Sequence, residues 1–205
     1  MTSHCSHIIG ETGLVKISQV INSIFRSCTY LLSRDGCTWL VDCGDVDSIL
    51  PLIEGRLKGV LLTHAHFDHI YGLNHLLALF PDISIYTNLA GLEGLKNDKY
   101  NFSRYHEDPF VIDTPANVKI TDDGEFVSLF DGVKAQGIYT PGHSPCCVTW
   151  MVDEALFTGD SYIPGVKTVT NFPHSNKEMA RQSEDIIKNL ALNHIVYPGH
   201  APLVE

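Results

Sequence analysis

Short apolar runs separated by glycine- and aspartate-rich turns dominate the pattern along this chain. Apolar runs of about four to eight residues bounded by turn residues are typical of β-strands. The pattern predicts strands at 14–20, 28–32, 38–41, 59–62, 83–86 and 195–197, and mainly strands from 118 through 158.

Helical spacing of apolar residues indicates helices between these strands. After the run at 59–62, one helical face is predicted by Ile70, Leu73, Leu77 and Phe80. A short helix is expected at 47–54 despite Pro51. The sequence 175–178 has the form of a capping box and opens a helix to about residue 190. Its inner face is predicted to contain Met179, Ile186, Ile187 and Leu190.

Four polar residues cluster between the strand at 59–62 and the following helix: His64, His66, Asp68 and His69. Packing does not explain them, because buried imidazole and carboxylate groups each need a partner. Metal binding does. Residues two apart on an extended segment point the same way, so His64 and His66 can hold one ion. Asp68 and His69 can then face a second ion.

Two metal sites need more donors than this loop supplies. Three later donors each follow a glycine at the end of an apolar run: His143, Asp160 and His200. Glycine lets the backbone approach closely, so these donors can meet the first loop at one edge of a sheet. Each of the three alone would also fit a surface turn or a strand end.

The four pieces, taken in order, resemble the metallo-β-lactamase superfamily. The His-x-His-x-Asp-His loop at 64–69 is followed by His143, Asp160 and His200, and the resemblance spans roughly residues 20–200. It implies an α+β fold of the four-layer αββα sandwich type. The length of 205 residues suits a single domain, 1–205.

The resemblance also implies two divalent metal ions. It assigns one ion to His64, His66 and His143, and the other to Asp68, His69 and His200, with Asp160 bridging. Zinc is the default for such donors in a hydrolase, and iron and manganese accept the same set.

Three further residues are candidates for supporting roles. In the family, an acidic residue at the end of the third strand often supports a metal-bound histidine, and Asp42 stands there, whereas Asp45 fits better as a helix cap. Quorum-signal lactonases of the family use a tyrosine after the bridging aspartate as an electrophile. Tyr162 stands near that place, and packing is its other interpretation. His174 is a candidate proton shuttle or a plain loop residue.

Hydrolysis is the reaction that two such ions would support. Water held between them is acidified and can attack as a bridging hydroxide, while an oxygen of the substrate lies on one ion. We expect cleavage of an ester, thioester, lactone or related bond in a small, acidic substrate. Asp68 belongs to the predicted catalytic set, together with Tyr162 and His174.

Two alternatives remain open. A mononuclear iron dioxygenase acting on persulfides resembles the same scaffold and uses positions matching His64, His143 and Asp160. A binding module that holds metal without catalysis is the other. Glyoxalase II enzymes share the ligand set, but they carry a glycine- and arginine-rich segment where this chain has residues 161–167, which argues against a glutathione thioester.

Charge and composition narrow the class of substrate and the expected location of the protein. Asp and Glu number 24 against 14 Lys and Arg, a formal net charge of −10, which argues against nucleic acid as substrate. No apolar stretch has the length of a membrane span, and the amino terminus lacks a secretion signal. The six cysteines show no paired metal spacing and fit reduced thiols. We expect a cytoplasmic enzyme acting on a small molecule, of undetermined oligomeric state.

The segment 92–113 is long, polar and aromatic, and such segments are often lids or binding loops. We expect it to contact substrate, although a cover for a sheet edge also fits. Five histidines are expected in solvent or packing rather than on metal: His4, His7, His75, His106 and His194.

Overall fold

The computed structural model describes residues 7–12 and 15–202 of the chain. Seven strands lie side by side in chain order in the first sheet: β1 (His7–Thr12), β2 (Val15–Ile21), β3 (Cys28–Arg34), β4 (Cys37–Val41), β5 (Arg56–Leu61), β6 (Ser84–Thr87) and β7 (Val118–Ile120). Neighbours from β1 to β4 run antiparallel and those from β4 to β7 run parallel. The strand predicted at 14–20 is β2, with Leu14 outside the described residues. His4 also lies outside them.

The second sheet has five strands, in the spatial order β12 (Ile195–Pro198), β11 (Ala155–Gly159), β10 (Val148–Val152), β9 (Val133–Tyr139) and β8 (Phe126–Phe130). The pair β11 and β12 is parallel and the others are antiparallel. The strands predicted for 118–158 are therefore shared between the two sheets.

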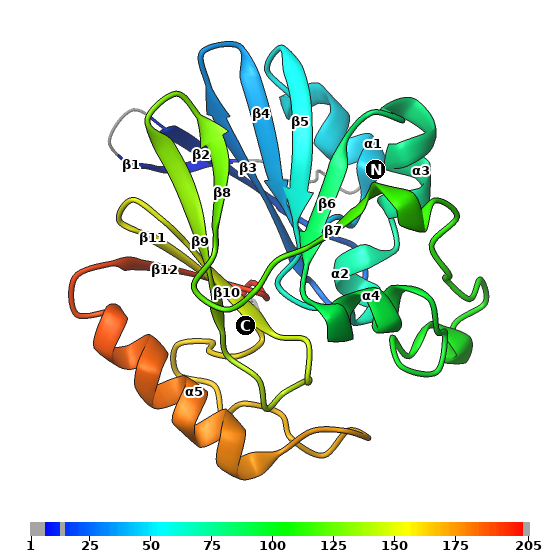
Figure 1. Cartoon of the computed structure of the whole chain (residues 1–205), viewed down its shortest axis with the longest axis vertical. Helices are drawn as coiled ribbons and strands as arrows, with labels where there is room; N and C mark the ends of the chain where they lie inside the picture. Colours follow the sequence, from blue (N-terminus) through cyan, green and yellow to red (C-terminus); the bar gives the residue numbers. More distant parts are fainter. Residues whose placement is uncertain (1–6, 13–14, 203–205) are drawn as a thin grey trace.

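Helices lie on the outer faces of both sheets. Those on the side of the first sheet are α1 (Val46–Ile49), α2 (Phe67–Ile70), α3 (Leu73–Leu79) and α4 (Leu89–Leu95), with 3₁₀ turns η1 (Leu50–Leu52), η2 (Ser103–Tyr105) and η3 (Pro115–Asn117). Beside the second sheet lies α5 (Lys177–Leu190), orange in Figure 1. The layers form the αββα sandwich that the sequence predicts (Figure 1).

The central strands β3 and β4 of the first sheet are buried on both faces, and neighbouring residues of these strands belong to different cores. Leu32 and Val41 belong to the core between the sheets, together with Phe157 of the second sheet. Leu31 and Leu40 belong to the core beneath the helices. Because successive side chains of a strand point to opposite faces, both must be apolar, which explains the continuous apolar runs.

Both tryptophans hydrogen-bond across the space between the sheets. Trp39 of β4 donates its indole N–H to the carbonyl of Leu129 in β8 at 2.9 Å. Trp150 of β10 donates in the opposite direction, to the carbonyl of Leu62 at 2.8 Å. A buried indole N–H needs a partner, so the two bonds fix the position of each sheet on the other.

Two predicted helices are interrupted. The helix predicted after residue 69 is divided into α2 and α3 at Gly72, where an added Cβ would lie 2.0 Å from the carbonyl oxygen of Gly44. The helix predicted at 47–54 becomes α1 followed by η1, because Pro51 has no N–H to donate.

The predicted inner face of α5 is partly wrong. Ile187 is buried, but Met179 and Ile186 are exposed. The residues that pack are Ala180, Ser183 and Ile187, and Ser183 donates to the carbonyl of Pro141 at 2.6 Å. Small residues face the sheet here because the helix lies close to the backbone of the loop after β9, a constraint that hydrophobicity alone does not reveal.

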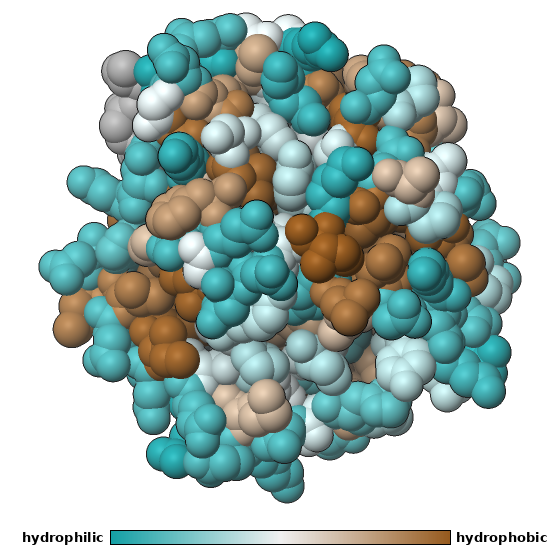
Figure 2. All heavy atoms as spheres, viewed as in Figure 1, coloured by the Kyte–Doolittle hydropathy of each residue, from teal (hydrophilic) through white to brown (hydrophobic). Residues whose placement is uncertain are grey.

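The exterior has both hydrophilic and hydrophobic areas (Figure 2). Figure 2 shows a largely hydrophilic face with separate hydrophobic patches. Among the helices of the described residues, none is long and apolar enough to cross a membrane.

Candidate metal centre

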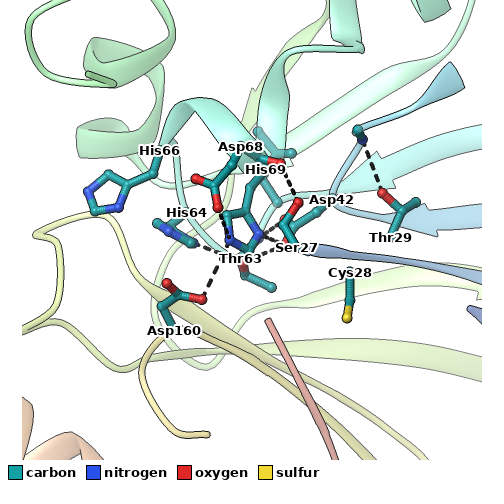
Figure 3. A network of polar contacts seen from close by, with 12 residues as sticks. Ser27, Cys28, Thr29, Asp42, Thr63, His64, His66, Asp68, His69 and Asp160 are labelled. Atoms are coloured by element: carbon teal, nitrogen blue, oxygen red, sulfur yellow. Dashed lines mark hydrogen bonds and ion pairs between the residues drawn. The ribbon is translucent and has the colours of Figure 1, made fainter. Parts of the chain in front are cut away.

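The candidate donors lie at the ends of strands from both sheets. His64 to His69 follow β5 and enter α2, on the side of the first sheet. The other three follow strands β9, β11 and β12 of the second sheet: His143, Asp160 and His200. The N–H of Val148 donates to the carbonyl of Thr63 at 2.7 Å and joins the first loop to β10. Figure 3 shows His64, His69 and Asp160 pointing toward one another.

Three donors form the first cluster: His64, His66 and His143. Their donor atoms lie within 4.8 Å of one another, and all three side chains are buried. Nε2 of His143 is 2.9 Å from Nδ1 of His66. This spacing brings ring nitrogens of different imidazoles to a common point, as ligands of one ion require.

A second cluster has its own three donors: Asp68, His69 and His200. Nε2 of His200 lies 3.3 Å from Oδ2 of Asp68 and 3.3 Å from Nε2 of His69. The donors that the resemblance assigned to each ion are therefore grouped in space.

Asp160 lies between the two clusters. Its Oδ2 is 3.4 Å from Nε2 of His143 and 3.3 Å from Nε2 of His200, one histidine from each cluster. Gly199 makes room for this carboxylate, because a Cβ at that position would lie 2.3 Å from Oδ1 of Asp160. A carboxylate in this place can contact two ions at once.

The second ring nitrogen of most of these histidines is held by the protein. Nδ1 contacts an oxygen in four cases: His64 with Thr63 at 3.1 Å, His69 with Asp42 at 2.8 Å, His143 with the carbonyl of Val169 at 2.8 Å, and His200 with the carbonyl of Phe25 at 2.9 Å. Such contacts fix the tautomer and leave Nε2 free to coordinate. In His66 it is Nδ1 that faces the cluster.

Asp42 organises the base of the site. Its Oδ1 accepts from the N–H of Thr63 at 2.7 Å, and its Oδ2 accepts from the Thr63 hydroxyl at 2.7 Å and from His69. Asp45, the expected helix cap, precedes α1 but makes no side-chain cap hydrogen bond. Its carboxylate instead accepts from the N–H and hydroxyl of Ser23.

The charge states of the donors suit a cation. Burial lowers the pKa of His66 to about 3 and that of His64 well below its ordinary value, so both rings are neutral. Nε2 of His64 and Oδ1 of Asp160 are buried without a hydrogen-bond partner, although Oδ1 lies 3.5 Å from Nε2 of His69. Unpaired buried lone pairs are costly, and a metal ion would satisfy both atoms.

In the second cluster, the histidines and carboxylates shift one another's pKa values. Burial alone would lower the pKa of His69, but the carboxylates of Asp68 and Asp160 raise it well above its ordinary value. Burial alone would raise the pKa of Asp160, but His200 and His69 hold it well below its ordinary value. The ionised carboxylate therefore attracts cations, and the donor set fits a pair of divalent ions.

A cavity of about 570 Å³ opens beside both clusters. The segment 92–113 contributes Phe102, Tyr105 and His106 to its lining. Asn101 holds this segment in place: its side chain donates to the carbonyls of Gly94 and Phe110, both at 3.0 Å. His106 packs on Phe67 with ring centroids 4.4 Å apart, so packing rather than open solvent accounts for it.

Several lining residues carry no recognisable signal in the sequence: Phe25, Ile163, Val169, Phe172 and Pro173. Tyr162 and His174, the two candidate catalytic residues near them, do not line the cavity. The ring of Tyr162 lies under Nζ of Lys188 at 5.9 Å, and His174 stacks on Tyr100 at 4.6 Å. Their catalytic roles stay predictions.

Comparison with known proteins identifies the family. The sequence model of the metallo-beta-lactamase superfamily matches residues 25–200. The chain belongs to this superfamily. The match begins at Phe25, whose carbonyl contacts His200, and ends at His200 itself, so it includes all seven candidate donors of the metallo-beta-lactamase pattern.

Similar proteins agree with this membership. A probable metallo-hydrolase of Streptococcus pyogenes is 30% identical over 95% of this chain and 88% of its own length. An atrochrysone carboxyl ACP thioesterase of Aspergillus fumigatus is 28% identical over 86% of this chain, which spans 51% of that protein. The crystal structure of the B3 metallo-beta-lactamase BLEG-1 superposes with a TM-score of 0.80 at 24% identity, covering 92% of this chain and 93% of that one.

Proposed function

We propose that this chain, a metal-dependent hydrolase of the metallo-beta-lactamase superfamily, cleaves a thioester or ester of a small carboxylic acid at a pair of divalent metal ions. The observation that carries the proposal is the position of Asp160, within 3.4 Å of a histidine of each donor cluster. The name of the fungal relative, a thioesterase, favours the thioester. Zinc is the first candidate metal.

The donor clusters define what each residue would do. One ion would be held by His64, His66 and His143, and the other by Asp68, His69 and His200, with Asp160 shared. When bound, such ions acidify water and polarise a carbonyl oxygen. Asp42, Thr63 and the carbonyls of Phe25 and Val169 keep the imidazoles oriented. Aromatic side chains border the space in front of the donors.

Elemental analysis and turnover test the proposal together. The purified protein is loaded separately with zinc, iron and manganese, and its metal content is measured. Each form is then assayed with chromogenic thioesters, esters and lactones. We expect about two ions per chain and hydrolysis of thioesters, with loss of both after treatment with a chelator.

Oxygen consumption, measured with an oxygen electrode, tests the dioxygenase alternative. A single iron per chain, with oxygen consumption on addition of a persulfide and no hydrolysis, would overturn the proposal in favour of the dioxygenase alternative. Full metal occupancy without turnover of any substrate class would favour a binding module.

A further inference from the structure

The cavity beside the donors is lined mainly by rings, and its charges indicate what enters it. Building on the proposed hydrolase function, we infer that the substrate is an ester or thioester whose acyl group is uncharged and carries an aromatic ring. Two groups of aromatic side chains, one beside each donor cluster, carry the inference, together with the absence of lysine and arginine from the described lining.

The first aromatic wall consists of Phe102 and Phe172. Their ring centroids are 5.2 Å apart, and both rings contact His66, at 4.9 Å and 5.7 Å. Phe172 also lies 5.8 Å from the ring of His143. This wall therefore borders the cluster formed by His64, His66 and His143.

The second aromatic wall consists of Phe25, Phe67 and His106. His106 packs on Phe67, and its ring meets that of Phe25 edge to face at 6.0 Å. Phe67 precedes the donor Asp68, and the carbonyl of Phe25 contacts His200. This wall therefore borders the other cluster.

The two walls come from segments far apart in the sequence. Phe25, Phe102 and Phe172 lie in three different loops. Outside the cavity, Tyr100 and His174 stack with a centroid separation of 4.6 Å and an interplanar angle of 20°. This contact joins the loop of Phe102 to the loop of Phe172 and keeps the first wall in position.

Charge in the cavity argues against an acidic acyl group. Among the described residues, its lining includes no lysine or arginine, and the carboxylates in it are the donors Asp68 and Asp160. Arg26 follows Phe25 but does not line the cavity. A carboxylate or phosphate at the far end of the acyl group would lie against the aromatic walls, away from the donors that would hold the ions, and would have no lysine or arginine as a partner. We therefore infer a neutral acyl group in place of the acidic substrate expected from the sequence.

Size and surface agree with an aromatic acyl group. The volume of about 570 Å³ lies within the range of small-molecule sites. Aromatic side chains favour flat, apolar ligands through offset and edge-to-face contacts. The scissile carbonyl then lies at the donors while the ring of the acyl group lies against the walls.

Three thioesters of one neutral thiol, N-acetylcysteamine, test the inference on the zinc-loaded chain. Their acyl groups are phenylacetyl, butyryl and succinyl. We expect kcat/KM for the phenylacetyl thioester to exceed that for the butyryl thioester by about 10- to 100-fold, because a buried phenyl ring removes more apolar surface from water. The succinyl thioester is expected to be the poorest substrate.

Binding is measured separately from turnover with ketones in which a CH₂ group replaces the sulfur and which cannot be cleaved. Calorimetry compares 1-phenylpentan-2-one with heptan-4-one on the same zinc-loaded chain. We expect the aromatic ketone to bind at least about tenfold more tightly.

Variants of the first wall test the residues. Phe172 is 41% exposed, so F172A removes a ring without opening the core. We expect F172A to reduce the ratio of phenylacetyl to butyryl kcat/KM about tenfold. The matched control is F126A, since Phe126 of β8 is 57% exposed and lies outside the cavity. Its ratio should equal that of the unmodified chain.

The outcomes separate this inference from the proposed function. Equal kcat/KM for the three thioesters, or a preference for succinyl, overturns the aromatic acyl group and leaves hydrolysis standing. A fully loaded chain that cleaves none of the thioesters, esters and lactones but prefers the aromatic ketone overturns hydrolysis and supports the preference of the cavity. If the ratio of phenylacetyl to butyryl kcat/KM is unchanged in F172A, Phe172 does not contribute to recognition of the acyl group.

Discussion

Nδ1 of His69 lies 2.8 Å from Oδ2 of Asp42, and both side chains are buried. Asp42 adopts a left-handed backbone conformation, with φ of 59°. A residue other than glycine in this region carries a conformational cost of about 1 kcal/mol or more. The hydrogen bonds from Thr63 to the same carboxylate hold it there. The strained conformation of Asp42 is thus retained at the residue that orients His69, a candidate ligand.

Replacing Asp42 by asparagine tests this relationship. The D42N change keeps the size of the side chain but removes the charge that fixes the tautomer of His69. We expect zinc affinity to fall by about 10- to 100-fold, measured by competition with a chromogenic chelator. D47N is the control, because Asp47 is an exposed aspartate in α1. Equal affinities in the two variants would show that Asp42 has no such role.

Removing a donor from either cluster should abolish turnover. D68A and H143A each take one ligand from a different cluster, so both are expected to reduce thioester hydrolysis to the background rate while the circular dichroism spectrum stays unchanged. H75A is the control, since His75 is exposed and belongs to neither cluster. Activity retained in D68A or H143A would contradict the mechanism.

Metal removal should destabilise the whole chain. Binding to the folded state alone stabilises it by about 4 kcal/mol when free metal is a thousandfold above its dissociation constant. For a chain of this size, chelation should therefore lower the melting temperature by roughly 10 °C. Differential scanning calorimetry before and after chelation, with zinc added back, measures the effect. An unchanged melting temperature in a chain shown to be metal-free would argue against a metal centre in the folded protein.

Gly199 should be required by the candidate metal centre. In G199A, the new Cβ would lie 2.3 Å from Oδ1 of Asp160 and 2.7 Å from the carbonyl carbon of Gly159, so both the carboxylate and the backbone that carries it must move. We expect metal content and turnover to fall sharply. The control is G132A, because nothing lies within 4 Å of a Cβ added to Gly132.

The control should lose about 1 kcal/mol of unfolding free energy, because Gly132 has a φ of 73° that alanine adopts only with strain. It should keep its metal. Chemical denaturation measures the stability of both variants, and elemental analysis measures their metal content. A G199A protein with full metal occupancy would mean that Asp160 tolerates displacement.

Most strands and the cluster at 64–69 could be predicted because their signals are local, whereas His143, Asp160 and His200 are ambiguous one by one and gain meaning only from their order along the chain. Runs such as 28–32 must be apolar on both faces, and a loop with His64, His66 and His69 has no packing explanation. The break between α2 and α3 could not be predicted, because it depends on the approach of Gly44 to Gly72. Strand β1 has no counterpart among the predicted strands, since its short run carries little alternation.

The remaining features of the site depend on backbone carbonyls and on contacts between residues far apart in the sequence. His143 and His200 are oriented by the carbonyls of Val169 and Phe25, and every residue has a carbonyl, so no side chain marks these positions. The contact of Phe102 with Phe172 joins loops 70 residues apart, a pairing that single-sequence periodicity does not reveal.

The reciprocal indole bonds of Trp39 and Trp150 have a consequence for the order of assembly. The candidate donors are divided between the two sheets, and neither half of the molecule holds a complete donor cluster by itself. The two indole bonds fix the packing of the sheets at which the donors of each cluster meet. A metal ion would then bind only after the two sheets have packed correctly. A chain whose sheets are wrongly packed would bind no metal and would be inactive.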